Sequence, residues 1–223
     1  MSSTAIPRAA NVKLVLASQS PARLALLRNA GFAPEAIVSG VDEDAVDAQS
    51  PAMLALMLAQ AKARTVARRV EPGALVVGCD SVLDLDGEPY GKPSDAQDAI
   101  GRWKAMRGRE GILVTGHCLI DTRSGRGDDA SAKDSDWREV TRAAATLVRF
   151  AHISDAEIDA YVATGEPLHV AGAFTLDGYG ASFVESIGGD PSNVIGLSLP
   201  LLRVMLGELG IAVADLWKTH PKG

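Results

Sequence analysis

Residues 12–21 read VKLVLASQSP, and this stretch indicates the class of fold that the chain adopts. Its first part, Val12 to Ala17, is short, apolar and partly β-branched, which predicts a buried strand. Ser20 and Pro21 then suit the N-cap and the first position of a helix that would end near Gly31. A strand, a tight loop and a helix in this order are typical of an α/β protein.

The same start signal returns at Ser50, where it opens a second amphipathic helix. That helix would end among Arg68 and Arg69, whose positive charges suit a helix C-terminus. A second apolar run then covers residues 74–78 and ends abruptly at Asp80. We therefore expect a second buried strand whose end carries a carboxylate.

Hairpins and further helices follow in the second half of the chain. We expect a hairpin turn at Asp86 and Gly87, and later an antiparallel pair of strands around a polar loop insertion at residues 122–141. We interpret the insertion as a solvated loop, with a partner-binding hairpin as the alternative. The predicted strands of the pair cover residues 112–121 and 143–150, and helices are expected to start at Ser94, Ser154 and Ser198.

These elements predict an α/β protein with a mixed, twisted sheet flanked by helices. We expect one domain over residues 12–216, because no internal repeat and no long linker divides this part of the chain. Residues 1–11 and 217–223 are expected to be flexible tails.

The composition argues against several classes of protein. The 223 residues carry 22 Lys and Arg against 28 Asp and Glu, a net charge of −6, and 47% of them are apolar, as in an average globular protein. An acidic chain without a basic stretch is a poor candidate for nucleic acid, and its longest uncharged stretch, residues 48–61, is too short to cross a bilayer. Because Cys79 and Cys118 lack pair spacing and no secretion signal is present, we expect a cytoplasmic protein without disulfides or a zinc site.

Four charged side chains stand out by their positions. Asp80 follows an apolar run, and ligands of open α/β sheets bind beyond strand ends; the alternative is that Asp80 caps the next turn. Lys62 lies at the edge of an apolar helix stripe, where snorkelling to water is the default and an anionic partner is the alternative. Lys92 projects from a turn between a glycine and a proline, which surface solvation would also explain. Arg23 opposes the dipole of its helix unless an anion lies between them.

Taken together, these groups fit one kind of ligand. The three basic side chains, with the carboxylates of Asp42, Glu43 and Asp80, suit a polyphosphate held by basic groups and a divalent metal held by acids. Walker-type loops, dinucleotide fingerprints, zinc-protease motifs and nucleophile elbows are absent from the sequence. We expect structural roles for the scattered histidines His117, His152 and His169.

A set of short motifs occurs in a fixed order along the chain. They are LASQSPAR at 16–23, VDE at 41–43, AKA at 61–63, GCDS at 78–81, GKP at 91–93, TGEP at 164–167, GAF at 172–174 and NVIGL at 193–197. In this set the sequence resembles the Maf family, the septum-formation-inhibitor-like nucleoside triphosphate pyrophosphatases, over residues 12–209. The resemblance implies an elongated, two-lobed, inosine-triphosphatase-like fold with a central cleft, often dimeric. It also implies hydrolysis of a nucleoside triphosphate between its α and β phosphates, with Mg²⁺ or Mn²⁺ as cofactor.

The resemblance also implies roles for single residues. Asp80 matches the proton acceptor that activates water, and Glu43 matches an acid that holds metal or positions that water, so both are candidate metal ligands. Because an ordinary Asp is a weak base at neutral pH, we expect the metal to acidify the water and Asp80 to orient it or bind metal. The residues that match the family's phosphate-binding groups and loop are Arg23, Lys62, Lys92, Ser18 and Ser20.

Three positions that the family associates with substrate choice depart from its pattern, so a base preference does not carry over. They are Ala22 in place of a second arginine, Ser81 in place of a threonine, and Asp177 in place of the glutamine of the thymidine- and uridine-triphosphate-specific subgroup. His169 and Val170 also replace a frequent Asp-Lys pair. We expect an enzyme that removes noncanonical or surplus nucleotides, with a nucleotide-binding regulator of septum formation or cell division as the alternative.

Overall fold

A single mixed sheet runs through the protein in the computed structural model, which describes residues 12–123 and 137–218. Its seven strands have the order β2-β1-β3-β5-β6-β7, with β4 paired to β3. β1 is parallel to β2 and β3, and the other pairs are antiparallel. The strands are β1 (Lys13–Leu16), β2 (Glu35–Ala36), β3 (Ala74–Leu85), β4 (Glu88–Tyr90), β5 (Glu110–Asp121), β6 (Arg138–Phe150) and β7 (Val184–Gly188). The expected mixed α/β sheet is thereby confirmed.

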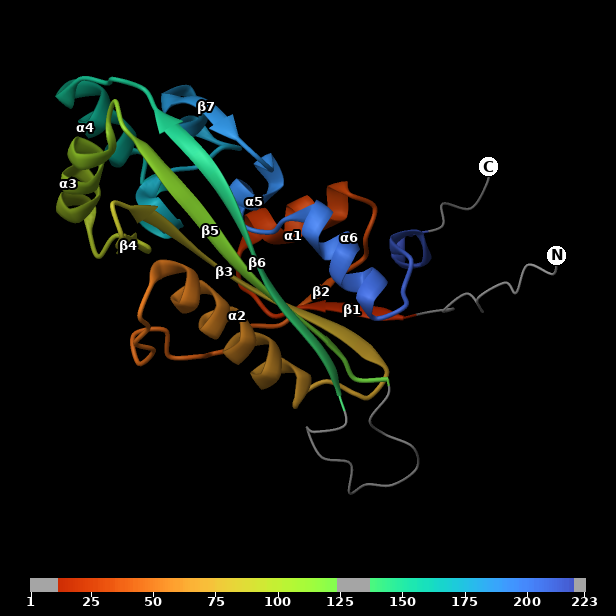
Figure 1. Ribbon diagram of the computed structural model, residues 1–223. Coiled ribbons are helices and arrows are strands. Elements are labelled where there is room, and N and C mark those ends of the chain that lie inside the picture. Colours follow the sequence, from red (N-terminus) through yellow and green to blue (C-terminus); the bar gives the residue numbers. More distant parts are fainter. Residues whose placement is uncertain (1–11, 124–136, 219–223) are drawn as a thin grey trace, which may run out of the picture.

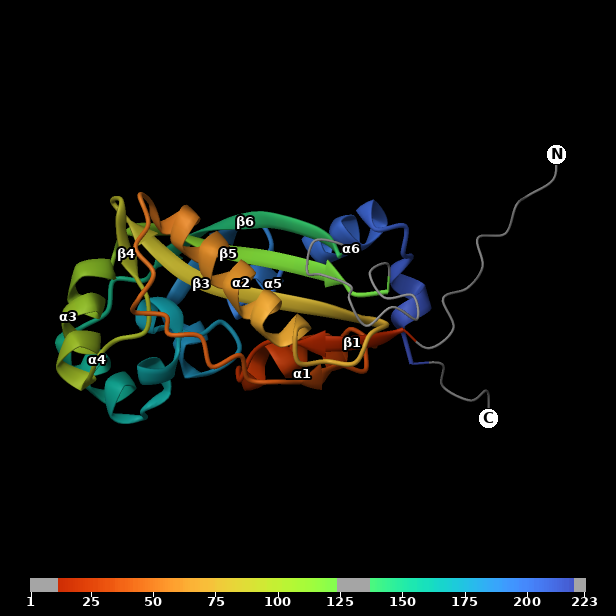
Figure 2. The same cartoon turned by 90° about the horizontal axis from the view of Figure 1, so that it is seen from below.

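Helices cover both faces of this sheet, and the molecule is elongated along its three long strands (Figures 1 and 2). α2 crosses one face of β3 and β5, while α1, α5 and α6 lie on the other face, and α3 and α4 lie together at one end. The helices are α1 (Pro21–Asn29), α2 (Pro51–Ala67), α3 (Ala96–Met106), α4 (Asp155–Ala163), α5 (Pro191–Ile195) and α6 (Leu199–Glu208). Short 3₁₀ helices are η2 (Glu166–His169), η3 (Ala171–Ala173), η4 (Tyr179–Phe183) and η5 (Val213–Leu216). In the described part of the chain, no helix is long and apolar enough to cross a membrane.

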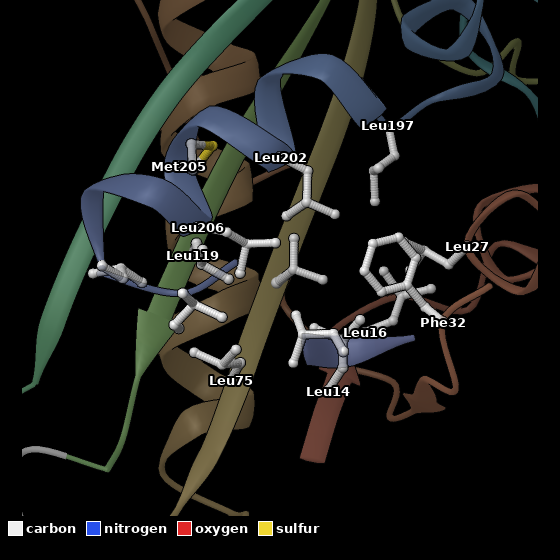
Figure 3. Packing of buried hydrophobic residues seen from close by; sticks show 14 of the residues in the cluster. Leu14, Leu16, Leu27, Phe32, Leu75, Leu119, Leu197, Leu202, Met205 and Leu206 are labelled. Atoms are coloured by element: carbon white, nitrogen blue, oxygen red, sulfur yellow. The ribbon is translucent and has the colours of Figure 1, made fainter. Parts of the chain in front are cut away.

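Two separate apolar clusters lie along the face of the sheet that α1 and α6 cover. The first joins Leu75 and Leu119 of the sheet to α1 and α6, and Figure 3 shows Leu202 and Leu206 packed over these strands. The second lies toward α3 and α4 and is centred on Trp103. The opposite face of the sheet packs its small and β-branched side chains against α2.

Most helix starts follow the predicted cap residues. The hydroxyls of Ser20, Ser50, Ser154 and Ser198 each accept a backbone hydrogen bond in the first turn of α1, α2, α4 and α6. The expected cap at Ser94 is wrong by one residue, because the Asp95 carboxylate accepts from the Asp98 N–H and caps α3 instead.

The structure corrects the predicted ends of two strands. β3 does not end at Asp80 but continues to Leu85, since β5 pairs with it from Leu75 to Asp84. β6 begins at Arg138 rather than at residue 143, so the insertion is shorter than expected. The polar residues at the start of β6 have partners on helices: Glu139 accepts from Arg64 of α2. Residues 124–136 of the insertion lie outside the described part of the chain.

The C-terminal segment contacts the rest of the fold two residues further along the chain than expected. Trp217 forms a β-bridge with Phe32, and the Lys218 N–H donates to the Gly31 carbonyl at 2.9 Å. These two residues therefore belong to the fold and not to a tail. The predicted tails at residues 1–11 and 219–223 lie outside the described residues.

Candidate active site

The site begins where β3 loses its neighbour on one edge. β1 pairs with β3 as far as Val77, and β4 pairs with β3 from Leu83 onward on the same edge. Between them, no described strand pairs with this edge of residues 78–82. Asp80 lies in the middle of this stretch, so the ligand-binding position that we expected at a strand end lies beside the end of β1 instead.

Two glycines bring α2 unusually close to the sheet. A Cβ atom on Gly78 would lie 2.7 Å from the Ala63 nitrogen, and one on Gly116 would lie 2.7 Å from the Leu56 nitrogen. Gly116 is also the cross-strand partner of Asp80. Because only glycine leaves room for the helix backbone here, α2 can place its next inward side chain, Lys62, against Asp80.

Lys62 lies between two carboxylates. Its ammonium contacts Asp80 Oδ1 and lies 2.7 Å from Glu43 Oε1, and its side chain is only 8% exposed. Snorkelling to water, the default expectation, is therefore wrong, and the alternative of an anionic partner is confirmed. Glu43 comes from the turn that precedes α2 and stays partly open to solvent.

The pKa values of the two carboxylates are shifted in opposite directions. Burial raises the pKa of Asp80 above its ordinary value, and the charges of Lys62 and Arg23 only limit this rise. At Glu43 burial also acts to raise the pKa, but the Lys62 hydrogen bond and the charges of Lys62, Lys92 and Arg23 hold the pKa below its ordinary value. Asp80 is therefore a stronger base than an ordinary aspartate, and Glu43 is a weaker base than an ordinary glutamate.

Arg23 continues the hydrogen-bond ladder of β1 along the free edge of β3. The Ala17 N–H donates to the Val77 carbonyl, and two residues further Arg23 Nη1 donates to the Cys79 carbonyl at 2.9 Å. Nη1 also donates to Ser18 Oγ, Nη2 to Ser81 Oγ at 3.0 Å, and Nε to the Gly196 carbonyl at 2.7 Å. The guanidinium thus uses four of its five N–H groups within the protein.

The two candidate loop serines order the turn between β1 and α1. Ser18 Oγ accepts from the Ser20 N–H at 3.1 Å, and Ser20 Oγ accepts from the Arg23 N–H at 3.3 Å. These bonds fix the start of α1 and hence the direction in which Arg23 leaves the helix.

Lys92 projects from a loop that other residues hold firmly. The carbonyl of Gly91 accepts from Arg102 Nη1 at 2.7 Å and from the Gly172 N–H at 3.0 Å. Arg102 is itself paired with Asp98 of α3. Lys92 is exposed, and its charge helps to lower the pKa of Glu43. It therefore acts on the same site from the side opposite to α1.

The three predicted specificity positions lie in different surroundings. Ser81 accepts a hydrogen bond from Arg23. Ala22, which precedes Arg23 on α1, is half-buried. Asp177 is exposed and makes no hydrogen bond or ion pair with another described residue. Its segment is held by Glu166, whose carboxylate accepts from the hydroxyls of Tyr161 and Thr175 and from the N–H groups of residues 179 and 180.

Sequence reasoning missed the residues that support the site. It assigned no role to Gly78, Gly116, Thr115 or Arg102. A glycine inside a strand pattern signals a close approach of backbone, so the two glycines could have been found. Thr115 carries no local signal, because its partners Ser81 and Asn193 are distant in the chain, whereas the pairing of Arg102 with Asp98 four residues before it could have been found.

One family profile matches most of the chain. The profile of the Maf family, described as Maf-like protein, matches residues 13–209. A nucleoside triphosphate pyrophosphatase of Streptomyces coelicolor is 62% identical over 206 residues, covering 92% of this chain and 94% of that protein. One of Streptomyces avermitilis is 60% identical over 211 residues, covering 94% and 97%. A solved structure, a nucleoside-triphosphatase (dITP/XTP pyrophosphatase) of Mycobacterium abscessus, is 19% identical with a TM-score of 0.37, covering 64% of this chain and 76% of that one.

Proposed function

The chain belongs to the Maf family, and on this premise we propose that it is a nucleoside triphosphate pyrophosphatase that cleaves between the α and β phosphates. The observation that carries the proposal is the Lys62 ammonium between Asp80 and Glu43, with Arg23 beside them. Two cations and two carboxylates at one place match a triphosphate that arrives with a divalent cation.

The basic groups have donors left for phosphate. Lys62 has three N–H donors, and its described contacts take two of them. Arg23 retains one N–H, and Lys92 is exposed. We assign these groups to the phosphate oxygens, where preorganised positive charge stabilises the charge that develops on the departing pyrophosphate.

Asp80 receives the proton in this proposal. A water oxygen attacks the α phosphorus, the bond from the α phosphorus to the bridging oxygen breaks, and the water proton passes to Asp80 Oδ2. The products are nucleoside monophosphate and pyrophosphate. The raised pKa of Asp80 suits this role better than an ordinary Asp would, because a base works best when its pKa approaches the working pH. In this proposal Asp80 accepts the proton in addition to the expected acidification of the water by the metal.

The acids also fit a divalent cation. Asp80 and Glu43 each place one oxygen on the same ammonium, so the two carboxylates are close enough to share an ion. No group of three or more metal-ligating side chains occurs among the described residues, and Mg²⁺ is commonly held by one or two carboxylates together with substrate phosphates. Asp80 and Glu43 would hold Mg²⁺ or Mn²⁺, which would neutralise phosphate charge there.

The test is release of pyrophosphate from a panel of canonical and modified nucleoside triphosphates. Asp80→Asn should lower kcat/KM at least about 100-fold, as expected for loss of a general base, and a chelator should abolish turnover. Asp84→Asn is the matched control, because Asp84 lies on the same strand and its carboxylate accepts, among the described residues, only from the Gly87 N–H.

Two outcomes would contradict this function. Absence of pyrophosphate release from every triphosphate would overturn it, and nucleotide binding that survives in Asp80→Asn would then favour the regulator. Full activity of Asp80→Asn would remove Asp80 from the mechanism. The panel also shows whether the preferred base is noncanonical, as removal of unwanted nucleotides requires.

A further inference from the structure

A layer of polar side chains separates the two apolar clusters on the α1 and α6 face of the sheet. This polar layer consists of the buried Thr115 of β5, Thr146 of β6 and Asn193 of α5, together with the partly buried Ser81 of β3. Thr115 and Asn193 are completely buried. Buried polar groups cost stability unless they are hydrogen-bonded, so their bonds show what the layer holds in place.

The direction of the hydrogen bonds in the layer can be deduced. Thr115 Oγ1 lies 3.1 Å from the Asn193 carbonyl, which can only accept, so Thr115 donates its one proton there. Ser81 Oγ lies 2.9 Å from Thr115 Oγ1 and must therefore donate to it. The lone pairs of Ser81 Oγ are then free to accept from Arg23 Nη2. The order is Arg23 to Ser81 to Thr115 to the Asn193 carbonyl.

The end of this chain of bonds is fixed by the sheet. Asn193 Nδ2 donates to the Leu113 carbonyl at 3.2 Å and to Thr146 Oγ1 at 3.1 Å, which anchors α5 to β5 and β6. The turn that ends α5 also provides the Gly196 carbonyl that accepts from Arg23 Nε. The NVIGL motif thus holds the guanidinium at two points, directly and through Thr115 and Ser81.

We propose that Thr115 is a positioning residue for the reaction, which acts on Arg23 through Ser81 and never touches the substrate. The proposal rests on the proposed function, because it takes the guanidinium as a phosphate ligand. Without the Thr115 hydroxyl, the Ser81 proton has no acceptor in the layer, and the Ser81 hydroxyl turns. Arg23 Nη2 then loses an acceptor of fixed position. The one N–H group of Arg23 that is left for the substrate is then no longer directed at a phosphate oxygen.

A double-mutant cycle tests the proposal. Thr115→Val should lower kcat/KM by about 10- to 150-fold, the range expected for loss of one hydrogen bond to a charged group, here the bond from Arg23 to Ser81. In a Ser81→Ala background the same substitution should change kcat/KM less than about 2-fold, because the link is already broken. Thr115→Ser, which keeps the hydroxyl, should restore activity. A wild-type rate in folded Thr115→Val, or losses that multiply in the double variant, would overturn the proposal.

Thr122→Val is the matched control. Thr122 is also buried at the end of β5, and it exchanges two hydrogen bonds with the backbone of Ala74. Its loss should lower stability but leave kcat/KM within about 2-fold of wild type, since no bond connects it to Arg23. If Thr115→Val does not fold, Thr115→Ala takes its place in the cycle.

A measurement without substrate separates this proposal from the proposed function. Hydrogen exchange of the Arg23 guanidinium, followed by ¹⁵N NMR, should become at least about tenfold faster in Thr115→Val and stay unchanged in Thr122→Val. Unchanged exchange in Thr115→Val would overturn the link to Arg23 even if the enzyme is active. Faster exchange in a protein that releases no pyrophosphate would retain the link and reject the function.

Discussion

A buried charge at the site is tolerated because an opposite charge touches it. Lys62 would be costly to bury on an apolar helix face, and Asp80 would be costly in the middle of a strand. Their mutual contact, with Glu43 on the same ammonium, makes both positions stable. The ammonium therefore limits the rise in pKa that burial causes at Asp80, and it also fixes the position of this carboxylate.

Removal of the Lys62 charge should raise the pKa of Asp80 further. Burial raises the pKa of Asp80, and the charge of Lys62 is the largest effect that lowers it. Lys62→Met should therefore raise this pKa and shift the acid limb of the pH profile of kcat/KM to higher pH. A ¹³C NMR titration of the Asp80 carboxyl measures the same shift in variants with little activity. Lys104→Met, an exposed lysine of α3, is the control and should leave the titration unmoved. An unchanged Asp80 titration in Lys62→Met would contradict the role given to this ion pair.

At the scale of elements, the site depends on how closely α2 approaches β3 and β5. Gly78 and Gly116 provide this approach, and the predicted strand patterns treat both as ordinary apolar positions. A methyl group at either position would have to push the helix backbone away from the sheet. Lys62 would move with the helix.

Gly116→Ala should therefore damage both stability and activity. Overpacking typically costs about 1–3 kcal/mol of the free energy of unfolding, and a displaced Lys62 should lower kcat/KM by more than about tenfold. Denaturant unfolding and pyrophosphate release measure the two effects. Gly101→Ala on α3 is the control, because it has open space around it and should stabilise the protein by about 0.5–1 kcal/mol. A Gly116→Ala protein with wild-type stability and rate would disprove the close-packing argument.

At the scale of the whole molecule, one buried histidine joins the last helix to the sheet. His117 Nε2 of β5 accepts from the Ser198 N–H at 2.8 Å, and Nδ1 donates to the Thr115 carbonyl at 3.0 Å. Both ring nitrogens are used by the neutral form, so the predicted structural role of His117 is confirmed. Burial and the charge of Arg23 lower the pKa of His117 to about 4.

This histidine should make the protein sensitive to mild acid. Because the pKa is lower in the folded protein than in the unfolded chain, the unfolded chain binds the proton first as pH falls below about 6.5. Stability is then lost progressively toward pH 4, by about 2 kcal/mol at pH 5 relative to pH 7. Urea unfolding at both pH values measures the loss. His117→Gln should remove most of this pH dependence and His152→Gln, at an exposed position, should not; equal slopes in all three proteins would contradict the argument.

Across the whole molecule, the structural features that could be predicted from the sequence are those that depend on local chemistry. Helix starts at Ser20 and Ser154 were predictable because a cap bonds to residues two or three positions away. The length of β3 was not, because the strand continues through Asp80 only with a partner strand on one side and Lys62 above it. The homodimer and the cytoplasmic location stay predictions.

The amino-acid sequence by itself determined the alternation of strands and helices, the family and the set of charged residues to which we assign the chemistry as a proposal, since caps, apolar periods and short motifs are local properties of the chain. Only the tertiary structure decided that Lys62 is an ion-pair partner rather than a surface lysine, that burial raises the pKa of Asp80, and that Ser81 faces Arg23. These properties depend on burial and on partners far away in the chain. The folded sheet supplies both, and the local sequence does not.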